Sequence, residues 1–412
     1  MARSEITDVF TPRHSTVNSS MYIERKRPET ALIRSIKGSM HSFLFGESGN
    51  GKSWLYKKVF TEQKVVYVVA NCANASIKNS VIEEIYSVCQ EAGKSIKTGY
   101  TETKKAELLG SGLSHEADYE IIQEDKLLNS FKKLYQKSNK QKSVIVLDNV
   151  ETIFDNEKLM GELSDIIILL DDARYAQYNV KFLLVGVPHE VMQYFSSAKN
   201  ASSVANRIEE LNRVTGLDYP QVRLFVRKGF EEFLDVSLTK EQAKVLSRHI
   251  FDITLGVPQR IHEYCISLAY AIEDHGWIYE ESLMNIADHR WLMKGLRGCY
   301  NIIDSHLNSD ETSDGRRNQV IYSLAGITTH QLDTNGVGAV ISKEFPNTAP
   351  ESKSGIGQVL ANLSKGKNPI LKRISNSGGY VVTDPRHLMC IKVMLYKNES
   401  TEQVRKKRFS VS

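Results

Sequence analysis

The stretch that decides the fold is a short apolar run followed directly by a glycine-rich turn. It reads His41-Ser-Phe-Leu-Phe45 and then Gly46-Glu47-Ser48-Gly49-Asn50-Gly51-Lys52-Ser53, with Trp54 next in the chain. An apolar strand that enters a Gly-x-x-x-x-Gly-Lys-Ser turn and is followed by a helix is typical of a phosphate-binding loop. The glycines permit positive φ and a close approach of the backbone, so successive N–H groups can surround an anion. We therefore expect residues 46–54 to bind phosphate groups.

The last two residues of this turn have specific expected roles. Lys52 is expected to reach the β- and γ-phosphates of a nucleotide, and the Ser53 hydroxyl to bind Mg²⁺. The helix that starts at Lys52 adds the positive end of its dipole. The alternative is a glycine-rich turn that matches the pattern by chance, and the flanking strand and helix argue against it.

A second apolar strand ends in an acidic residue and supports the same interpretation. Residues 143–151 read Ser-Val-Ile-Val-Leu-Asp-Asn-Val-Glu. Asp148 stands at the end of this strand, where a carboxylate can hold Mg²⁺ directly or through water. The alternative is an aspartate that caps the next helix. Ser53 and Asp148 are thus the predicted metal ligands.

The composition of the chain is that of a globular protein with several domains. Its 412 residues are 41% hydrophobic and 25% charged, with a net charge of +4. This length predicts roughly two to four domains, and so mild a charge does not by itself establish a nucleic-acid partner. The five cysteines form no CxxC pair, which indicates free thiols in a reducing compartment. No apolar leader or membrane-spanning run is visible, so we expect a cytoplasmic protein without a membrane partner.

Hydrophobic periodicity divides the chain into parts of different character. Apolar runs at 41–45, 64–70, 143–147 and 181–185 alternate with helical patterns. This alternation predicts a parallel sheet with helices on both faces, the α/β fold of P-loop NTPases, and the consecutive amphipathic helices that follow predict an all-α lid. The expected parts are an N-terminal arm (1–27), the α/β domain (28–217, with an exposed insertion at 93–118), the helical lid (218–304), a further domain (316–396) and a basic tail (397–412).

The domain expected at 316–396 combines short helices with a hairpin. Helical patterns cover 319–324, 338–345 and 355–363, a hairpin covers 370–383, and a last helix ends at Tyr396. This order resembles a winged-helix domain, which can place a helix in the DNA major groove. The candidate phosphate contacts are Lys353, Lys365, Lys367, Lys372 and Arg373. Winged-helix domains also serve as protein-docking modules, and surface lysines are common, so a structural role stays open.

The P-loop, the strand ending Leu-Asp-Asn-Val-Glu, the strand Lys-Phe-Leu-Leu-Val-Gly and the helical lid together resemble the AAA+ and STAND superfamily of ATPases. The resemblance covers about residues 28–295 and is nearest to origin-recognition-type and transposition-helper ATPases. It implies ATP and Mg²⁺ as cofactors. Relatives share a Gly-x-Pro-x-Arg signature in the lid, matched here by Gly256-Val257-Pro258-Gln259-Arg260. By this resemblance Arg260 would contact the γ-phosphate; otherwise it is a surface arginine in the first turn of a helix.

The chain departs from these relatives at two places. They usually carry Glu directly after the aspartate of the second strand, as general base, whereas this chain has Asn149 there and Glu151 two residues later. Glu151 replaces that base if the turn folds back, because a base must reach the attacking water. Otherwise hydrolysis is slow and ATP acts as an assembly signal. The strand at 181–185 also ends without the usual polar residue, and His189 is the nearest polar candidate.

The resemblance further implies an arginine finger supplied by a neighbouring subunit. Arg207 and Arg213 follow the strand expected at 181–185, where relatives supply this residue, and Arg207 is our preferred candidate. Either arginine can instead pair with Glu209 or Glu210 on a helix surface.

Two functions remain open at this point. The first is an ATP-switched AAA+-like regulator that hydrolyses ATP slowly, assembles through its nucleotide site and acts on double-stranded DNA. The second is a STAND-type signalling or phage-defence ATPase whose partner is a protein effector, with the winged helix structural. A metabolic kinase fits less well, because the lid and winged helix do not suit a small phosphate acceptor. Salt-dependent DNA binding separates the first two.

Overall fold

The computed structural model describes residues 3–91, 125–187, 195, 200–308, 316–327, 331–349, 354–374 and 378–409. The chain divides into two compact units, one formed by residues 24–215 and the other by residues 1–23 together with 216–412. The insertion predicted at 93–118, His189 and Lys353 lie outside the described residues.

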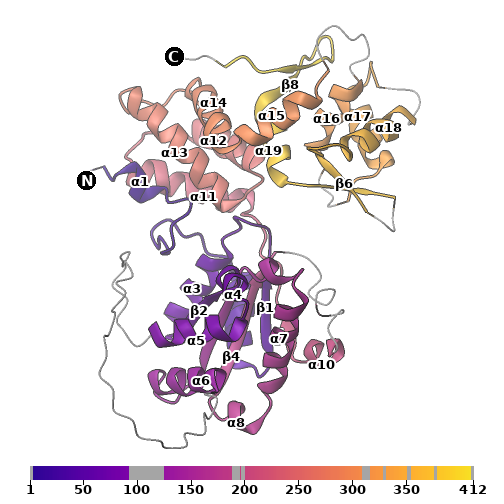
Figure 1. Cartoon of the computed structure of the whole chain (residues 1–412). Coiled ribbons are helices and arrows are strands. Elements are labelled where there is room, and N and C mark those ends of the chain that lie inside the picture. The colour runs from indigo at the N-terminus through magenta and orange to yellow at the C-terminus, as the bar shows by residue number, and fades with distance from the viewer. Residues whose placement is uncertain are drawn as a thin grey trace, which may run out of the picture. The chain divides into compact units, whose positions relative to one another are not determined.

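The 24–215 unit contains a five-stranded parallel sheet (Figure 1). Its strands are β1 (His41–Phe45), β2 (Val66–Asn71), β3 (Ser143–Asp148), β4 (Val180–Gly186) and β5 (Ile208–Glu210). They lie in the order β2-β3-β4-β1-β5. Phe45 is opposite Gly186 and Asp148 is opposite Val185. The carboxyl ends of β1, β3 and β4 therefore meet at one edge of the sheet, where ligands bind in folds of this class.

Helices cover both faces of this sheet, as the apolar strands predict. They are α2 (Lys26–Lys37), α3 (Lys52–Glu62), α4 (Cys72–Lys78), α5 (Val81–Glu91), α6 (Lys126–Lys137), α7 (Glu157–Leu169), α8 (Ala173–Ala176) and α10 (Ala201–Ala205), with a 3-10 turn η1 (Val150–Ile153). On β3, Val144 and Val146 pack with α2 and α3, whereas Ile145 and Leu147 pack with α4 to α7. Successive side chains of a strand point to opposite faces, so a strand buried on both sides is apolar throughout.

One strand of this sheet was not predicted from the sequence. β5 lies in a stretch expected as a surface helix, and it pairs with β1. A strand of three residues is too short to show an alternating pattern. The chain then continues beside β1, where the N–H groups of Leu211 and Val214 donate to the carbonyl oxygens of Phe43 and Phe45 at 2.9 and 2.8 Å. Residues 208–214 thus support the turn that follows β1.

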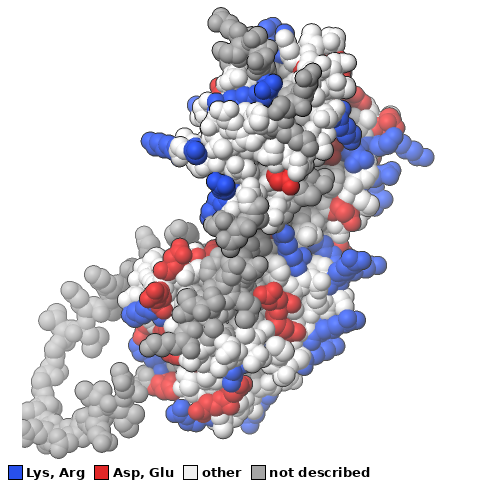
Figure 2. Space-filling view, turned by 90° about the vertical axis from the view of Figure 1, so that its right-hand side faces the viewer, with Lys and Arg blue, Asp and Glu red and all other residues white. Residues whose placement is uncertain are grey.

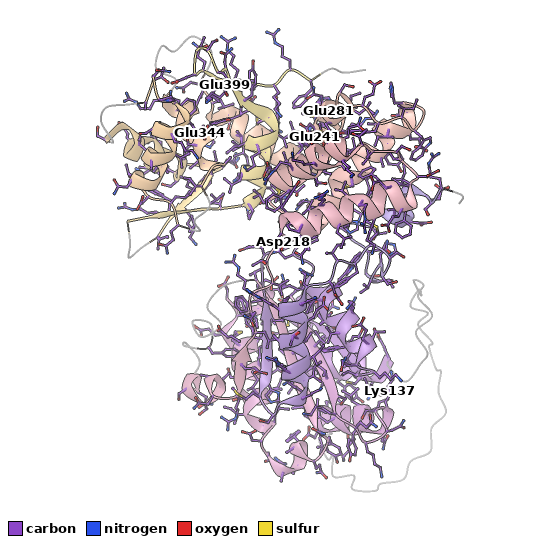
Figure 3. All side chains as sticks on the ribbon, turned by 180° about the vertical axis from the view of Figure 1, so that it is seen from behind. Lys137, Asp218, Glu241, Glu281, Glu344 and Glu399 are labelled. Carbon is purple, nitrogen blue, oxygen red and sulfur yellow. The ribbon has the colours of Figure 1, made fainter. Side chains whose placement is uncertain are left out.

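The helices predicted for residues 218–304 are present. They are α11 (Tyr219–Val226), the π-helical segment η2 (Arg227–Phe233), α12 (Lys240–Thr254), α13 (Pro258–Asp274), α14 (Leu283–Gly295) and α15 (Arg297–His306). Asp218, labelled in Figure 3, and Thr239 begin α11 and α12 with capping boxes. In each box the cap side chain and a glutamine three residues later accept each other's backbone N–H groups, which fixes where the helix starts.

The N-terminal residues are not the extended arm that the sequence predicts for 1–27. Residues Ile6–Val9 form the helix α1, and Phe10 is 1% exposed in the core of the 216–412 helices. The Thr11 N–H donates to His262 Nδ1 at 3.0 Å. A Cβ on Gly229 would lie 2.6 Å from the Phe10 ring, so this glycine makes room for the segment. The segment shows no sequence period because its few apolar residues pack against partners far along the chain.

The last part of the chain contains the predicted three helices and hairpin. The elements are α16 (Arg316–Leu324), α17 (Thr334–Glu344), α18 (Ser354–Leu363), β6 (Leu371–Arg373), β7 (Tyr380–Val382), α19 (Pro385–Met394), β8 (Leu395–Lys397) and β9 (Val404–Lys406). β6 and β7 pair antiparallel. Residues 397–409 are not a free basic tail, because β8 and β9 also pair antiparallel. The winged-helix assignment stays a prediction.

The cysteines and the helix lengths complete the description of the fold. All five cysteines are buried free thiols. Among the described residues, none of the helices combines the length and apolar character needed to span a bilayer.

Candidate nucleotide-binding site

The predicted phosphate-binding loop connects the end of β1 to the start of α3. Gly49 and Gly51 have φ of 86° and 76°, a region that residues with a Cβ rarely adopt. Ser48 is exposed on the loop. Ser53 and Trp54 lie in the first turn of α3, where backbone N–H groups have no partner within the helix. The turn therefore brings glycine backbone and a helix N-terminus together, an arrangement that binds phosphate.

The chain that continues from β5 braces this loop. A Cβ on Gly46 would lie 2.3 Å from the Val214 carbonyl oxygen, so only glycine fits there. Asn50 is 3% exposed and donates from Nδ2 to the same oxygen at 3.0 Å. Glu47 accepts a hydrogen bond from Arg213 Nη2 at 2.7 Å. Two residues predicted only as phosphate contacts, Gly46 and Asn50, thus also join the loop to the edge of the sheet.

The Lys52 ammonium group lies across the loop and near three carboxylates. Its Nζ donates to the carbonyl oxygens of Gly46 and Glu47 at 2.7 and 3.2 Å. Burial lowers the pKa of Lys52, while the negative charges of Glu151, Asp148 and Glu47 act in the opposite direction. The positive charge is thus held at the place where the predicted role of Lys52 requires it.

The two predicted metal ligands lie side by side. Ser53 Oγ donates to Asp148 Oδ2 at 3.4 Å, and the Tyr56 hydroxyl donates to the same oxygen at 3.3 Å. The Asn149 N–H donates to Asp148 Oδ1 at 3.0 Å. A hydroxyl and a carboxylate are oxygen ligands of the kind that Mg²⁺ takes together with phosphate oxygens and water. This donor set fits Mg²⁺, and within the described ranges no group of three or more His, Cys, Asp or Glu side chains offers an alternative metal site.

Glu151 does fold back toward this site. It lies in η1, directly after β3, and its Oε2 is buried without a hydrogen-bond partner among the described residues. A Cβ on Gly186, the last residue of β4, would lie 3.2 Å from this oxygen. Buried carboxylate oxygens are normally paired, so Glu151 is an acceptor that the surrounding side chains leave open. It stands at the same sheet edge as the loop, and its charge acts on Lys52.

Comparison with known families identifies this unit. Residues 34–195 match a family model described as an AAA domain. This match covers less than half of the chain and lies within the 24–215 unit, hereafter the AAA unit. No curated protein sequence matches the chain.

Solved structures share the fold of this chain over most of its length. The Walker-type ATPase of Pyrococcus abyssi has a TM-score of 0.53 at 15% identity, covering 93% of this chain and 99% of that one. The ORC2 protein of Aeropyrum pernix, in its ADP form, has a TM-score of 0.50 at 13% identity, covering 95% and 97%. Similarity at this identity shows the fold alone, and it confirms the predicted P-loop NTPase architecture. The AAA match and this fold support ATPase activity.

Within the AAA domain, the structure explains why Asn149 does not take the usual place of the base. Its φ of 59° is left-handed, a conformation that Asn tolerates better than most residues with a Cβ. Its Nδ2 donates to Asn71 Oδ1 at 3.3 Å, so its side chain is directed toward β2. The left-handed residue turns the chain sharply, and Glu151 follows in the turn.

Arg25 is a residue of this site that the sequence did not reveal. Its guanidinium donates from Nη1 to Asn50 O at 2.6 Å and from Nη2 to Gly51 O at 3.2 Å. It also donates to Thr215 O at 3.4 Å, and its own N–H is bound by Glu29 Oε1 at 2.7 Å. Arg25 therefore ties the loop, the β5 side and the start of α2 together. It stands in a run of charged residues that is typical of solvated surface, so no local pattern marks it.

Replacing Arg25 with alanine is expected to weaken nucleotide binding about tenfold and to lower the melting temperature. The loop would lose hydrogen bonds from a charged donor, each worth about 1.5–3 kcal/mol. Part of this stabilisation is expected to be lost from the nucleotide-bound state, which lowers the affinity for nucleotide. Titration with a fluorescent ATP analogue and thermal unfolding measure both effects. Arg27→Ala is the matched control, because Arg27 is exposed two residues away. Equal nucleotide affinity in Arg25→Ala and Arg27→Ala would contradict the role of Arg25.

The two candidate arginine fingers lie at different places in the AAA unit. Arg207 pairs with Asp171 at 2.6 Å, and its carbonyl oxygen accepts from the His41 N–H at 2.8 Å. This is the amino end of β1, whereas the loop lies at its carboxyl end. Arg213 instead pairs with Glu47 of the loop. The predicted pairing with Glu209 or Glu210 on a helix is not formed, because both residues belong to β5.

Arg260 lies in the other unit, in the first turn of α13, and its contact with a γ-phosphate stays a prediction. Its Nη1 pairs with Glu263 Oε2 at 2.7 Å. The structure explains why the first residue of the Gly-x-Pro-x-Arg signature, Gly256, is a glycine. Gly256 has a φ of 69°, its carbonyl oxygen accepts from the Leu217 N–H at 2.7 Å, and a Cβ there would lie 2.2 Å from Leu217 O.

Proposed function

We propose that this protein binds ATP with Mg²⁺, hydrolyses it with Glu151 as the general base, assembles through its nucleotide site and acts on double-stranded DNA. The observation that carries the proposal is the open Oε2 of Glu151 beside Lys52 and Asp148. An unpaired carboxylate near a phosphate-binding lysine and a metal ligand is placed to accept a proton from water that attacks the γ-phosphate.

The bound groups would be held as follows. The phosphates would bind to residues 46–54, which include Lys52. Ser53 and Asp148 would hold Mg²⁺, and this ion would neutralise negative charge on the phosphates. Glu151 orients the water and takes its proton. Among the described residues of the 24–215 unit, the arginines that contact the loop are Arg213 and the buried Arg25. An arginine from a neighbouring subunit, Arg207 or Arg213, would supply the remaining charge, and this requirement links hydrolysis to assembly.

The proposed action on DNA rests on exposed cations near the C-terminal hairpin. Lys365 and Lys367 follow α18, and Lys372 and Arg373 lie on β6. All four are exposed, and none forms an ion pair among the described residues. Exposed cations on adjacent elements suit phosphate contacts. Elsewhere the charges are mixed: on the face in Figure 2, acidic side chains lie among the basic ones on both units.

Measuring the mass of the purified protein in solution tests assembly and the partner together. With ATP we expect oligomers, and with ATP and a duplex of about two helical turns we expect a larger complex. If four phosphates are contacted, the affinity for DNA should fall about 100-fold between roughly 50 and 200 mM salt. Lys372→Gln with Arg373→Gln should weaken DNA binding, and Lys132→Gln on the exposed side of α6 should not. Absence of DNA binding at low salt with ATP would favour a protein effector instead.

A further inference from the structure

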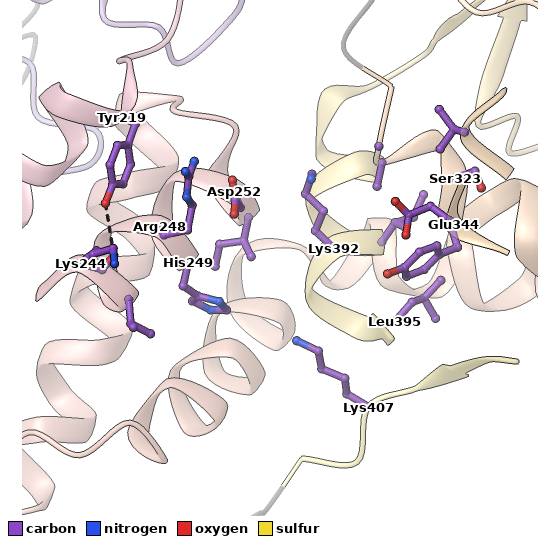
Figure 4. A pocket seen from close by; sticks show the side chains of 17 residues that line it. Tyr219, Lys244, Arg248, His249, Asp252, Ser323, Glu344, Lys392, Leu395 and Lys407 are labelled. Carbon is purple, nitrogen blue, oxygen red and sulfur yellow. Dashed lines mark hydrogen bonds between the residues drawn. The ribbon is translucent and has the colours of Figure 1, made fainter. Parts of the chain in front are cut away.

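The 216–412 unit contains a pocket that the proposed function does not use (Figure 4). Residues of α11 and α12 line one side, and residues of α16, α17 and α19 line the other, with Lys407 contributing after β9. Its volume is about 710 Å³, within the range of about 300–1,000 Å³ found for small-molecule sites. The pocket is therefore large enough for a ligand of nucleotide size.

Among the charged side chains that line this pocket, cations outnumber acids. The lining cations are Lys244, Arg248, Lys392 and Lys407, and the lining acids are Asp252 and Glu344. Arg248 and Lys392 come from opposite sides (Figure 4), and neither forms an ion pair among the described residues. Like charges that converge on a hollow repel one another and attract an anion. Lys244 pairs with Glu241 and Lys407 lies near Asp288. An anionic ligand would therefore chiefly neutralise Arg248 and Lys392.

Several of the other charges near the pocket are already paired, whereas Asp252, one turn after Arg248 on α12, is exposed and forms no ion pair among the described residues. Asp288 is 2% exposed, pairs with His249 at 2.7 Å and lies 3.6 Å from Lys407 Nζ. Glu344 lies 4.0 Å from Lys397. The Arg248 guanidinium lies over the Tyr219 ring, 4.6 Å from its centre. A guanidinium held flat against an aromatic ring keeps its edge free for two parallel hydrogen bonds to a phosphate.

A buried hydroxyl provides a second, independent indication of a ligand. Ser323 on α16 lines the pocket and is 1% exposed. Its Oγ has no hydrogen-bond partner among the residues that the structure describes. A serine within a helix usually donates to the carbonyl oxygen four residues earlier, and a buried hydroxyl without a partner is unfavourable. A ligand oxygen in the pocket would satisfy it.

We propose that this pocket binds a small phosphorylated molecule of about nucleotide size. A phosphate group carries up to two negative charges and three acceptor oxygens, and a molecule of this size can place such oxygens against Arg248 on one side and against Lys392 or Ser323 on the other. A single carboxylate has fewer acceptors for converging donors. The proposal does not rest on the nucleotide-binding role of the P-loop, because the lining residues all belong to the 216–412 unit.

Calorimetric titration with inorganic pyrophosphate tests the pocket in the full-length chain. The titration uses the Lys52→Ala variant, so that the P-loop contributes little, and we expect one saturable site. Adding Arg248→Gln and Lys392→Gln should weaken pyrophosphate binding at least tenfold, and adding Ser323→Ala should weaken it severalfold. The matched control adds Lys240→Gln and Lys343→Gln, which remove exposed lysines from α12 and α17 outside the pocket lining. Circular dichroism establishes that each variant is folded.

Each result of this titration has a definite meaning. A tenfold loss in the pocket variant and none in the control supports the site. The absence of a saturable site in folded Lys52→Ala, or equal affinities in the pocket and control variants, would refute it. A DNA duplex that displaces pyrophosphate and loses affinity in the same pocket variant would refute the small-molecule assignment and indicate a nucleic-acid surface instead.

Discussion

Replacement of Lys52 with alanine is expected to reduce the affinity for ATP by about 100-fold or more. The ammonium group lies across the loop, bound only to the carbonyl oxygens of Gly46 and Glu47, so it can transfer to phosphate oxygens when a nucleotide binds. A hydrogen bond to a charged group contributes about 1.5–3 kcal/mol, and Lys52 is expected to make more than one. Equilibrium titration with a fluorescent ATP analogue measures the change.

The Lys52→Ala result needs a control for the fold of the loop. Without the ammonium group, Glu151, Asp148 and Glu47 would repel one another, so thermal unfolding of the variant has to be compared with that of the unmodified protein. Lys57→Ala changes another lysine of the same helix and should leave ATP affinity unaltered. If Lys52→Ala melts like the unmodified protein and still binds ATP with the same affinity, residues 46–54 are not the nucleotide site.

Replacement of Glu151 with glutamine is expected to lower the rate of ATP hydrolysis about 100-fold while leaving ATP affinity within about threefold. Loss of a general base typically reduces a rate by about 10²–10⁴-fold. The open Oε2 is the atom that would accept the proton, and an amide of nearly the same shape cannot do so. Binding should persist, because the phosphate and metal contacts belong to other residues. Steady-state phosphate release and nucleotide titration measure the two quantities separately.

Two further variants make the Glu151 experiment decisive. Glu157→Gln removes an exposed carboxylate six residues later and should leave the rate unchanged. Asn149→Glu restores an acid at the position used by relatives, but it should not rescue Glu151→Gln, because residue 149 is left-handed and its side chain is directed toward Asn71. An unaltered rate in Glu151→Gln would exclude Glu151 as the base, and rescue by Asn149→Glu would assign that role to position 149.

The parts of the site that could be predicted are those formed by residues that are adjacent in the sequence. The glycines and Lys52 of the loop, and Asp148 at the end of an apolar strand, occupy fixed positions relative to a strand and a helix. Burial on both faces makes β1, β3 and β4 predominantly apolar, so their alternation with helices also predicted the parallel sheet.

The parts that could not be predicted depend on contacts between distant segments. β5 has three residues and becomes a strand because it pairs with β1. Arg25 donates hydrogen bonds to backbone carbonyl oxygens of the loop. Every residue has such an oxygen, so no pattern of side chains in the sequence indicates this contact. The N-terminal segment and the 397–409 segment are polar in composition, yet Phe10 and the β8–β9 pair tie them to the core. Whether Glu151 folds back likewise depended on the left-handed turn at Asn149.

The packing of Phe10 and α1 against the 216–412 helices bears on the order in which the chain matures during synthesis. The AAA unit is continuous in sequence and can be completed as soon as residue 215 leaves the ribosome. The other unit needs residues 1–23 as well as 216–412, so its first segment must wait, with its apolar side chains uncovered, until α11 and α13 have been made. Trimming the amino terminus would therefore damage the distant carboxyl-terminal half and spare the nearby P-loop.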